Sequence, residues 1–517
     1  MYDVIIIGGG ATGSGIALDA SLRGLKVLLI EAYDFAEGTS SRSTKLAHGG
    51  VRYLEAAVKH LDKNQYNLVK EGLYERYKIL KNAPHISSKL PLITPLYHFY
   101  EIPYIYSGLV LYDLLSGRYS IGKSRFLFPK ETIKEAPSVK KEHLKGAVKY
   151  YDGHFNDARM VISLLKSAQK LGAELKNHTE FKEFIFENGK ITGIKAYDKI
   201  KKETLTFKAK CVINATGPFS DFIRKKADPE TAPIMRPSRG IHIVIDKKYL
   251  PTNKGLLIPK TDDGRVVFIL PYKDKCLVGT TDVEANPEIH PKVTNEEIEY
   301  LLNQVNRYFD TDLKKEDILS SFAGIRPLVN KNPNAPTAKL TREHIIEKLP
   351  CNLVTITGGK WTTYRKMAEE TLDFVVEKFD FNKPLKKCLT NNYRVFGSEN
   401  YEKTKEKIDF SNPLQAHLFR LYGDQSIEIL NSIKKPDFLS EKYYITKEEL
   451  LYTLKNEWVK KPLDFIVRRT QTALIDREEA KKMLQKTTEI MGEFLKWDKN
   501  KTDNEFQEAL EILNTDI

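Results

Sequence analysis

The stretch Tyr2–Glu31, "YDVIIIGGGATGSGIALDASLRGLKVLLIE", decides the fold. It begins with an apolar run, which is followed by a glycine-rich turn, an amphipathic helical pattern and a second apolar run. Buried parallel strands have nearly continuous apolar sequences, and a crossover helix joins one such strand to the next. The stretch therefore predicts a strand–helix–strand unit that opens a parallel sheet, in an α/β fold of the Rossmann-like kind.

The glycines of this stretch predict a dinucleotide site. Gly8, Gly10 and Gly13 have the spacing G-x-G-x-x-G, and Glu31 ends the second strand. Two glycines allow the backbone to approach a pyrophosphate, and the third lets the helix pack closely on the strand. The helix N-terminus offers unpaired N–H groups, and the carboxylate accepts hydrogen bonds from ribose hydroxyls. FAD and NAD share this pattern, so other segments must distinguish them.

A second buried strand, "VINATGP" at residues 212–218, is the first segment that favours FAD. It carries Ala215 and Gly217 into a tight turn, where small residues permit a close approach to a cofactor. An NAD enzyme has no need of this element. The alternative interpretation is an ordinary turn at the end of a strand.

The segment "TGGKWTTYR" at residues 357–365 also favours FAD. A strand there meets Gly359, and Thr362 or Thr363 is placed to cap a helix that begins at this point. A helix N-terminus that faces the pyrimidine edge of a flavin stabilises negative charge on the reduced ring. Together with the glycine pattern, the two segments predict FAD as the cofactor.

Composition limits the function classes. The chain has 517 residues, of which 41% are hydrophobic, so it is predicted to be globular. No apolar run is long enough to span a bilayer and no signal peptide is recognised, which predicts a cytoplasmic protein. The cysteines are far apart and form no C-x-x-C pair, so we expect reduced, buried thiols and no metal site. They are Cys211, Cys276, Cys351 and Cys388.

The formal net charge of +13 leaves several interpretations open. It is compatible with nucleic acid, with an anionic membrane surface, with an anionic substrate or with a lysine-rich solvated surface. The apolar, aromatic segment Tyr104–Gly117 is too short to cross a bilayer. It is either a buried core helix or a helix that lies in a membrane interface.

The rest of the chain predicts three domains. Alternating patterns at residues 240–245, 265–271 and 275–280 indicate a second, more antiparallel sheet. Thr294 with Glu297, and later Thr446 with Glu449, form capping boxes that begin helices. The predicted domains are a discontinuous FAD-binding domain (1–80, 150–222 and 316–385), a substrate domain (81–149 and 223–315) and a C-terminal helical domain (386–517).

Several blocks of the sequence resemble the FAD-dependent, quinone-linked glycerol-3-phosphate dehydrogenases of respiration. They are "IIGGGATGSGIALDASLRG", "TSSRSTKLAHGGVRYLE", "NATGPFSD", "GTTDVE", "AGIRPL", "GGKWTTYRK" and the tail "EWVKKPLDFIVRRTQTALID". The resemblance implies a flavin between a cofactor domain of the amino-acid-oxidase type and a substrate sheet. It implies oxidation of sn-glycerol 3-phosphate to dihydroxyacetone phosphate, electron transfer to a quinone and peripheral contact with an anionic cytoplasmic membrane, and it leaves a homodimer open.

With this resemblance, the polar loop "SSRSTKLAHGGVRYLE" at residues 40–55 acquires a function. Hydroxyl groups in it and just before it are expected to donate to pyrophosphate and ribityl oxygens, and Leu46–Gly49 to run along the flavin ring. His48 is expected to pack against the flavin. The hydroxyl groups are those of Thr39, Ser40, Ser41, Ser43 and Thr44.

The phosphate of the substrate calls for guanidinium groups, which are always charged and make bidentate contacts. Arg52 and Arg326 are flanked by glycine and apolar residues, which favours a buried role over a surface one. The family match implies that these two form a cationic pocket with Arg342 and Lys360. Tyr53 is expected to orient the substrate through its hydroxyl.

Oxidation of a secondary alcohol also needs a base for the hydroxyl proton. His242 interrupts the apolar strand "RGIHIVI", either as a hydrogen-bonded core histidine or, as the family match implies, as the base. His48 is the alternative base.

Two other functions compete with this interpretation. A glycerol-3-phosphate oxidase would use the same scaffold and pass electrons to oxygen. A FAD-dependent tRNA-modifying protein would use the positive charge for RNA, but it would require basic residues interleaved with aromatic ones and a reactive cysteine. The cysteines lie in apolar or nondescript contexts, so nucleic acid is not predicted as a partner.

Overall fold

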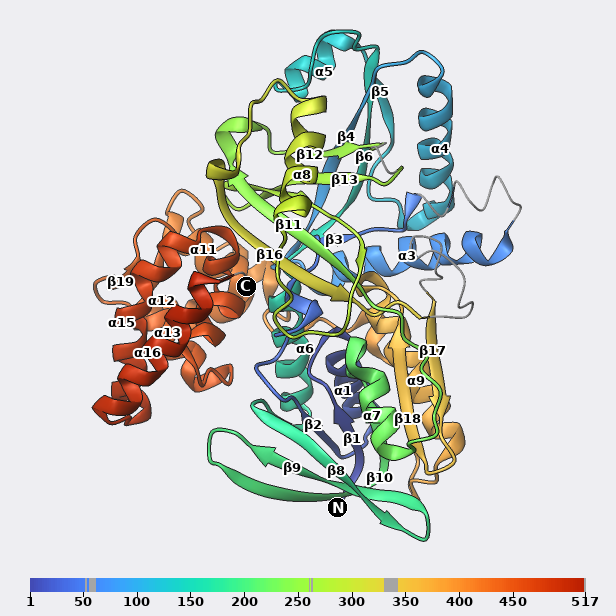
Figure 1. Ribbon diagram of the computed structural model, residues 1–517, viewed down its shortest axis with the longest axis vertical. Helices are drawn as coiled ribbons and strands as arrows, with labels where there is room; N and C mark the ends of the chain where they lie inside the picture. Colours follow the sequence, from blue (N-terminus) through green and yellow to red (C-terminus); the bar gives the residue numbers. More distant parts are fainter. Residues whose placement is uncertain (52–53, 55–61, 260, 262–263, 330–342, 516–517) are drawn as a thin grey trace.

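The computed structural model describes residues 1–51, 54, 62–259, 261, 264–329 and 343–515. Two β-sheets lie one above the other in the view of Figure 1, and the C-terminal helices pack beside them. The mixed α/β fold expected from the sequence is confirmed.

The first sheet is built around the strand–helix–strand unit predicted from the opening stretch. Strand β1 pairs in parallel with β2 and with β10, and β10 pairs in parallel with β18. Helix α1 crosses between β1 and β2 and packs against α6 and α9. The strand order is β17 (His344–Lys348), β18 (Leu353–Gly358), β10 (Glu203–Asn214), β1 (Tyr2–Ile7), β2 (Val27–Ile30) and β7 (Glu174–Lys176). The helices are α1 (Ala11–Arg23), α6 (Asp157–Lys170) and α9 (Tyr364–Lys378), and the hairpin β8 (Thr179–Glu187) and β9 (Lys190–Asp198) extends β10.

The second sheet is largely antiparallel, as the alternating patterns predict. Its strand order is β15 (Val283–Glu284), β11 (Ser238–Asp246), β14 (Lys275–Gly279), β13 (Val267–Tyr272), β12 (Gly255–Ile258), β4 (Ser87–Leu96), β6 (Gly146–Phe155) and β3 (Leu46–Ala47). Strand β16 (Ile318–Arg326) pairs with β11, and β5 (Arg125–Leu127) pairs with β6. The whole of β16 therefore lies in the second sheet, whereas the sequence places residues 316–385 in the FAD-binding domain. The domain limits themselves stay a prediction.

Two predicted helix starts are confirmed by their caps. Thr294 precedes α8 (Asn295–Tyr308), and its hydroxyl accepts a hydrogen bond from the amide of Glu297. Thr446 precedes α13 (Lys447–Asn456) and accepts in the same way from Glu449. In each case the side chain satisfies an N–H group that the first helical turn leaves unpaired.

The C-terminal helices pack against the second sheet. One apolar core joins Val244, Leu277 and Phe322 of that sheet to the helices that follow residue 438. Those helices are α13, the π-helical turn Asp464–Arg469, α14 (Thr472–Ile475), α15 (Arg477–Leu495) and α16 (Lys499–Asn514). Helices α11 (Pro413–Tyr422) and α12 (Ser426–Ser432) form a smaller core beside them. The C-terminal part is therefore built onto the sheet through shared apolar side chains.

Helix α4 (Glu101–Ser116) contains the apolar segment noted in the sequence, and it is not the buried core helix that was one of its two interpretations. Leu109, Tyr112 and Ser116 are its buried residues, whereas Tyr104 is 51% and Leu114 is 71% exposed. The helix lies on α3 (Lys63–Asn82) and β6 with one face and leaves the other uncovered (Figure 1). Among the described residues, we find no helix with the length and apolarity needed to cross a membrane.

Candidate functional site

The glycine-rich turn brings β1, α1 and β10 into close contact. A Cβ atom on Gly13 would lie 1.9 Å from the carbonyl oxygen of Gly8, so the helix packs on the strand only because this residue has no side chain. Gly8 has a φ of 113°, and a Cβ atom there would lie 2.6 Å from the carbonyl oxygen of Ala215. The close helix–strand packing expected at Gly13 is therefore confirmed, and Gly8 makes room for the end of β10 as well.

The N-terminus of α1 has a hydroxyl placed at it. Ser40 lies at that helix end, where its Oγ accepts a hydrogen bond of 2.9 Å from the amide of Ala11. A Cβ atom on Gly10 would lie 2.8 Å from the same oxygen. A helix N-terminus with a hydroxyl beside it and no side chain on the intervening glycine suits a pyrophosphate group.

Glu31 follows β2 and faces the glycine-rich turn. Its carboxylate oxygens accept hydrogen bonds from the amides of Gly9 (2.7 Å) and Tyr33 (3.0 Å). Burial raises the pKa of this carboxyl group, and these two hydrogen bonds act in the opposite direction. Each carboxylate oxygen accepts more than one hydrogen bond, so the group retains capacity for ribose hydroxyls. Turn, helix end and carboxylate together fit the adenosine diphosphate half of FAD.

The hydroxyl groups of the polar loop do not share one role. Ser43 donates to the carboxylate of Asp157 at 2.7 Å, and Thr39 donates to the carbonyl oxygen of Ile325 at 2.6 Å. The carbonyl oxygen of Ser41 accepts a hydrogen bond from the ammonium group of Lys45. These groups anchor the loop to α6 and to the second sheet, which leaves Ser40 as the hydroxyl at the helix end.

The loop continues along the second sheet. Leu46 is buried in β3, which pairs with β6, and the amide of His48 donates to the hydroxyl of Thr362 at 3.2 Å. Thr362 therefore connects the loop to the segment before α9. Neither Thr362 nor Thr363 caps α9 through its side chain, which corrects the expectation from the sequence. A short 3-10 turn, Trp361–Thr363, precedes the helix and directs these hydroxyls elsewhere.

The two small-residue turns lie where the strands of the first sheet end. Gly217 has a φ of 56° and follows β10, while Gly359 has a φ of 72° and follows β18. Thr357 connects the two turns, because its hydroxyl donates to the carbonyl oxygen of Gly217 at 3.2 Å. Adjacent parallel strands that end in such turns form the crevice where open α/β sheets bind their ligands.

His242 is buried in β11, with 2% of its surface exposed. Its ring stacks on Phe322 with centroids 5.1 Å apart, and its Nε2 lies 3.0 Å from the hydroxyl of Thr44. Its Nδ1 is buried and has no hydrogen-bond partner in the described structure. Burial, followed by the positive charges of Arg326 and Lys45, holds the pKa of this imidazole well below its usual value. The ring is therefore held in its neutral form, and Nδ1 is the ring nitrogen that has no hydrogen-bond partner in the described structure.

Arg326 ends β16, in register with Ser238 of β11. Its guanidinium group donates to the hydroxyl of Thr280 and to the carbonyl oxygen of Thr281, both at 2.9 Å, and lies 3.3 Å from the carboxylate of Asp282. A Cβ atom on Gly240 would lie 2.2 Å from this group, so the glycine makes room for it. The charge is thus held rigidly at the end of the second sheet.

Of the other three predicted cationic groups, the structure describes Lys360 alone. Lys360 lies beside a cavity of about 240 Å³, which Glu71, Glu343 and His344 also line. Arg52, Tyr53 and Arg342 lie outside the described residues. A phosphate pocket of four cations stays a prediction.

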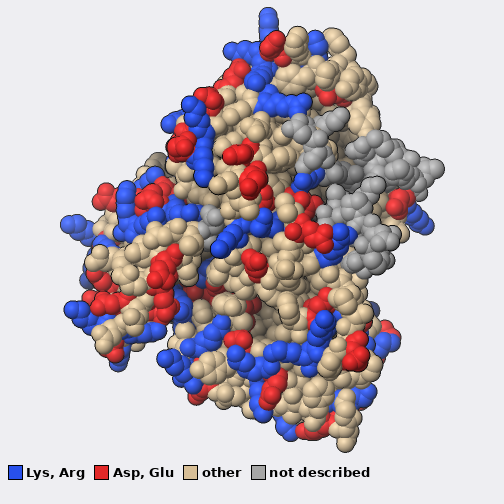
Figure 2. Space-filling model, viewed as in Figure 1, with Lys and Arg blue, Asp and Glu red and all other residues tan. Residues whose placement is uncertain are grey.

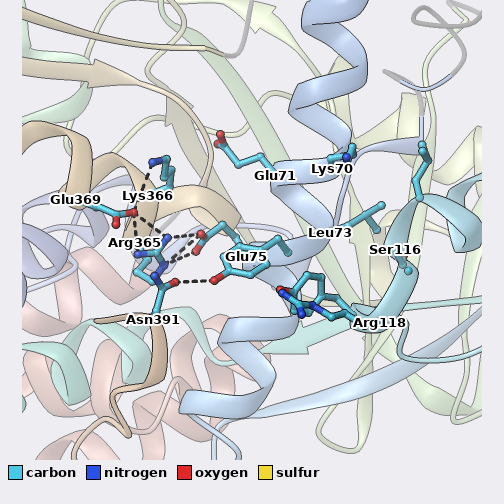
Figure 3. A pocket seen from close by; sticks show the side chains of 14 residues that line it. Lys70, Glu71, Leu73, Glu75, Ser116, Arg118, Arg365, Lys366, Glu369 and Asn391 are labelled. Carbon is cyan, nitrogen blue, oxygen red and sulfur yellow. Dashed lines mark hydrogen bonds and ion pairs between the residues drawn. The ribbon is translucent and has the colours of Figure 1, made fainter. Parts of the chain in front are cut away.

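A larger cavity, of about 580 Å³, lies between α3, α9 and the end of α4. Figure 3 shows that Arg365 points toward Glu75, whose carboxylate oxygens it binds at 2.6–3.1 Å. Tyr74 donates to Asn391 at 2.9 Å in the same cavity. None of the residues that line it belongs to the predicted site, so its size is not a guide to the chemistry.

The structure adds a buried ion pair that the sequence analysis missed. The ammonium group of Lys45 lies 2.7 Å and 2.8 Å from the two carboxylate oxygens of Asp157, and both side chains are fully buried. Lys45 follows Thr44, so the pair fixes the part of the loop that contacts His242. A lysine within the polar loop was visible in the sequence, but its partner is more than 100 residues away.

Comparison with known proteins agrees with this site. A family model of FAD-dependent oxidoreductases matches residues 3–362, and a model of the C-terminal domain of alpha-glycerophosphate oxidase matches residues 388–502. The probable mitochondrial glycerol-3-phosphate dehydrogenase of Caenorhabditis elegans is 39% identical, over 100% of this chain and 74% of that protein. The mitochondrial glycerol-3-phosphate dehydrogenase of Rattus norvegicus is 38% identical, over 99% of this chain and 73% of that protein.

A solved structure extends the likeness to three dimensions. The glycerol-3-phosphate dehydrogenase of Bacillus halodurans, solved in complex with FAD, has a TM-score of 0.80 and 30% identity. The alignment covers 99% of this chain and 94% of that one.

The glycine turn, the Glu31 carboxylate and the paired sheets define an FAD-dependent oxidoreductase, and FAD is its cofactor. The similarity extends over nearly the whole chain, including the C-terminal helices. The chain belongs to the family of FAD-dependent glycerol-3-phosphate dehydrogenases.

Proposed function

We propose that this chain oxidises sn-glycerol 3-phosphate to dihydroxyacetone phosphate and passes the electrons to a quinone. The observation that carries the proposal is the buried imidazole of His242, which has an unpartnered nitrogen and contacts Thr44 of the polar loop. A neutral imidazole where the loop meets the second sheet supplies the base that an alcohol dehydrogenation needs. The substrate named for the relatives, glycerol 3-phosphate, supports the choice of alcohol.

In this proposal the residues of the second sheet bind and orient the substrate. The guanidinium group of Arg326 binds the phosphate, and its bonds to Thr280 and Thr281 keep it in place before substrate arrives. Lys360 adds positive charge, together with Arg52 and Arg342. A charge held in advance costs little reorganisation when the substrate binds.

His242 accepts the proton of the C2 hydroxyl at Nδ1, while its Nε2 keeps the contact with Thr44. The stack on Phe322 fixes the plane of the ring. Bound FAD supplies the acceptor for the hydride that leaves C2. Burial of the imidazole excludes water, so that the proton passes to the ring and not to solvent.

The quinone and the membrane form a second part of the proposal, which helix α4 supports. Exposed aromatic residues lie on α4 and just before it, and Phe99 and Tyr100 are each 72% exposed. Lys145 lies 4.6 Å from the ring of Phe99, and Arg118 follows the helix. Aromatic side chains with nearby cations suit the interface of an anionic leaflet, where a quinone dissolves. Over the face seen in Figure 2, Lys and Arg side chains are interspersed with acidic ones.

An anaerobic reduction tests the activity. Purified protein loaded with FAD should be yellow, and sn-glycerol 3-phosphate added without oxygen should bleach the flavin absorbance. A flavin that stays oxidised would contradict the proposal. Aerobic turnover without added acceptor distinguishes the oxidase alternative, because hydrogen peroxide formed in proportion to turnover would identify oxygen as the acceptor.

Sedimentation with vesicles tests the membrane contact. The protein should sediment with vesicles that contain anionic phospholipid at low salt, and a variant with Tyr104→Ser and Leu114→Ser should sediment less. An exposed polar substitution on another face, Lys195→Gln, serves as the control, because Lys195 lies on the hairpin strand β9. Equal sedimentation of the double variant and the unmodified protein would exclude α4 as the contact.

A further inference from the structure

Gln471 joins three parts of the molecule through one amide group. It is 1% exposed and follows the π-helical turn of the C-terminal domain. Its amide oxygen accepts a hydrogen bond of 3.0 Å from the hydroxyl of Tyr272 in the second sheet. Its amide nitrogen donates at 3.2 Å to Asp157, the first residue of α6 beside the first sheet. A single side chain thus connects the C-terminal domain to the second sheet and to α6.

The backbone of Gln471 supports a role that depends on its position. Its φ of 60° lies in the left-handed region, which residues with a Cβ rarely adopt. Such a conformation persists where the surroundings determine it fully, and it is frequent at functional sites. The neighbouring residue Thr470 is also held, because its carbonyl oxygen accepts a hydrogen bond of 2.9 Å from Lys273.

Asp157 transmits this contact to the polar loop. One of its carboxylate oxygens accepts from both the amide (3.1 Å) and the hydroxyl (2.7 Å) of Ser43. Both oxygens bind the ammonium group of Lys45. Ser43 and Lys45 flank Thr44, so the carboxylate sets the position of the hydroxyl that contacts His242.

Aromatic contacts complete the same connection. The ammonium group of Lys45 lies 5.6 Å from the ring centroid of Phe322, on which His242 stacks, and 5.9 Å from that of Tyr272. Tyr272 is the residue that donates to Gln471. The buried ammonium group of Lys45 therefore lies between Asp157 and Tyr272, the two groups that Gln471 connects, and Phe322 lies between this cation and the imidazole.

A second set of bonds keeps this part of the C-terminal domain in place. Arg468 and Arg469 donate to the carboxylate of Asp34 at 2.6–3.0 Å. Asp34 lies near His178 and Asp464, and these three offer ligand atoms within 4.8 Å of one another. Because the guanidinium groups take the carboxylate oxygens of Asp34, the cluster is an ion-pair network that fixes residues 464–471 and not a cation site.

We propose that Gln471 is a positioning residue for the active site, by which the C-terminal domain holds loop residues Ser43–Lys45 and, through Thr44, the imidazole of His242. The inference rests on the proposed function of His242 as the base. The C-terminal domain is then part of the catalytic scaffold. Loss of the amide displaces the base without removing any group that binds the phosphate.

Rapid-mixing measurements of flavin reduction test this inference with Gln471→Gly. Glycine adopts a φ of 60° without strain, so the variant loses the amide while the backbone keeps its conformation. The limiting rate of flavin reduction should fall about tenfold or more, because a small displacement of a catalytic group has a large effect on rate. FAD content and the substrate concentration that gives half the limiting rate should both stay within about twofold of the unmodified protein. Simple loss of stability would lower FAD content together with the rate, so it would not give this result.

Three further variants sharpen the result. Lys496→Gly is the matched control, because Lys496 also has a left-handed φ, of 57°, in the C-terminal domain. Lys496 caps the end of α15 and has no bond to the loop among the described residues, so the rate of this variant should be unchanged. Gln471→Asn keeps an amide in a residue that tolerates the left-handed conformation and should recover part of the rate. If Gln471→Gly yields no folded protein, Tyr272→Phe removes only the hydroxyl that orients the amide and should lower the rate in the same way.

The outcomes separate the inference from the proposed function. Reduction of Gln471→Gly at the rate of the unmodified protein would overturn the inference, and so would a lower rate explained entirely by lost FAD. If glycerol 3-phosphate fails to reduce the flavin of the unmodified protein, the proposed function fails instead. In that case, the inference is tested by comparing the visible spectra of FAD bound to Gln471→Gly and to the unmodified protein. Identical spectra would show that Gln471 does not position the loop.

Discussion

The hydroxyl of Tyr112 accepts a hydrogen bond of 2.7 Å from the amide of Gly49 and donates one of 2.8 Å to Asp152. Tyr112 lies on the inner face of α4, while Gly49 follows His48 in the polar loop. The loop also lies against α3, because a Cβ atom on Gly49 would be 2.7 Å from the side chain of Leu73. The exposed apolar helix is thus bonded directly to the loop that is expected to run along the flavin.

This bond predicts the effect of Tyr112→Phe. The change leaves the buried amide of Gly49 without its partner and removes the hydrogen bond that the hydroxyl donates to Asp152. An unsatisfied buried polar group costs about 1–3 kcal/mol. We expect a lower midpoint of thermal unfolding, measured on the FAD-loaded protein, and a shifted visible spectrum of the flavin. Tyr106→Phe, on the exposed part of the same helix, should change neither, and an unaltered midpoint in Tyr112→Phe would contradict the assignment.

The glycine-rich turn gives a second prediction, which compares two glycines. In Gly13→Ala the new Cβ atom would lie 1.9 Å from a carbonyl oxygen, so α1 must move away from β1 and from the cofactor. In Gly38→Ala the new atom would meet nothing within 4 Å. We expect Gly13→Ala to be purified with little or no FAD, and Gly38→Ala to be as yellow as the unmodified protein. Absorbance at the flavin maximum relative to protein concentration measures this, and equal FAD content in the two variants would refute it.

Arg326 gives a third prediction, about substrate binding. Hydrogen bonds to charged groups contribute roughly 1.5–3 kcal/mol, so Arg326→Ala should lower kcat/KM for glycerol 3-phosphate about ten- to over a hundredfold, mainly through KM. The control is Arg236→Ala, because Arg236 lies near the same sheet edge and forms an exposed pair with Glu284. Steady-state kinetics with an artificial acceptor, on protein of equal FAD content, measures the effect. Unchanged kinetics in Arg326→Ala would remove it from the phosphate site.

The sequence predicted those parts of the fold and site that depend on local patterns. The strand–helix–strand unit, the two threonine caps and the close packing at Gly13 each lie within a short segment, and the structure confirms them. The pairing of Lys45 with Asp157 was not predictable in this way, because the two residues meet only when the sheets assemble. The same holds for Gln471, whose partners Tyr272 and Asp157 lie on β13 and α6, far apart in the sequence.

The structure decides between the two interpretations of α4 and corrects two expectations, about the threonines before α9 and about the cysteines. Apolar composition alone does not tell a buried helix from an interfacial one, so the exposure of α4 had to come from the packing around it. Thr362 and Thr363 precede a helix as capping residues do, but an intervening 3-10 turn alters the direction of their side chains. Of the cysteines, Cys211 and Cys276 are buried as expected, whereas Cys351 and Cys388 are partly exposed.

The last prediction concerns pH and the imidazole of His242. Its pKa in the folded protein lies well below the usual value of about 6.5, which the unfolded chain retains. Below about pH 6.5 the unfolded chain therefore binds a proton that the folded protein does not, and the free energy of unfolding falls as the pH falls. The slope approaches about 1.4 kcal/mol per pH unit between pH 6 and pH 5. In His242→Asn this contribution is absent, so the thermal midpoint of that variant should fall less between pH 7 and pH 5 than the midpoint of the unmodified protein.

His85 and His154, whose pKa values burial lowers to about 3 and about 4, contribute equally to both proteins and cancel in the comparison. Parallel pH profiles for the two proteins would mean that folding does not lower the pKa of His242, which would contradict the burial of a neutral imidazole at this position.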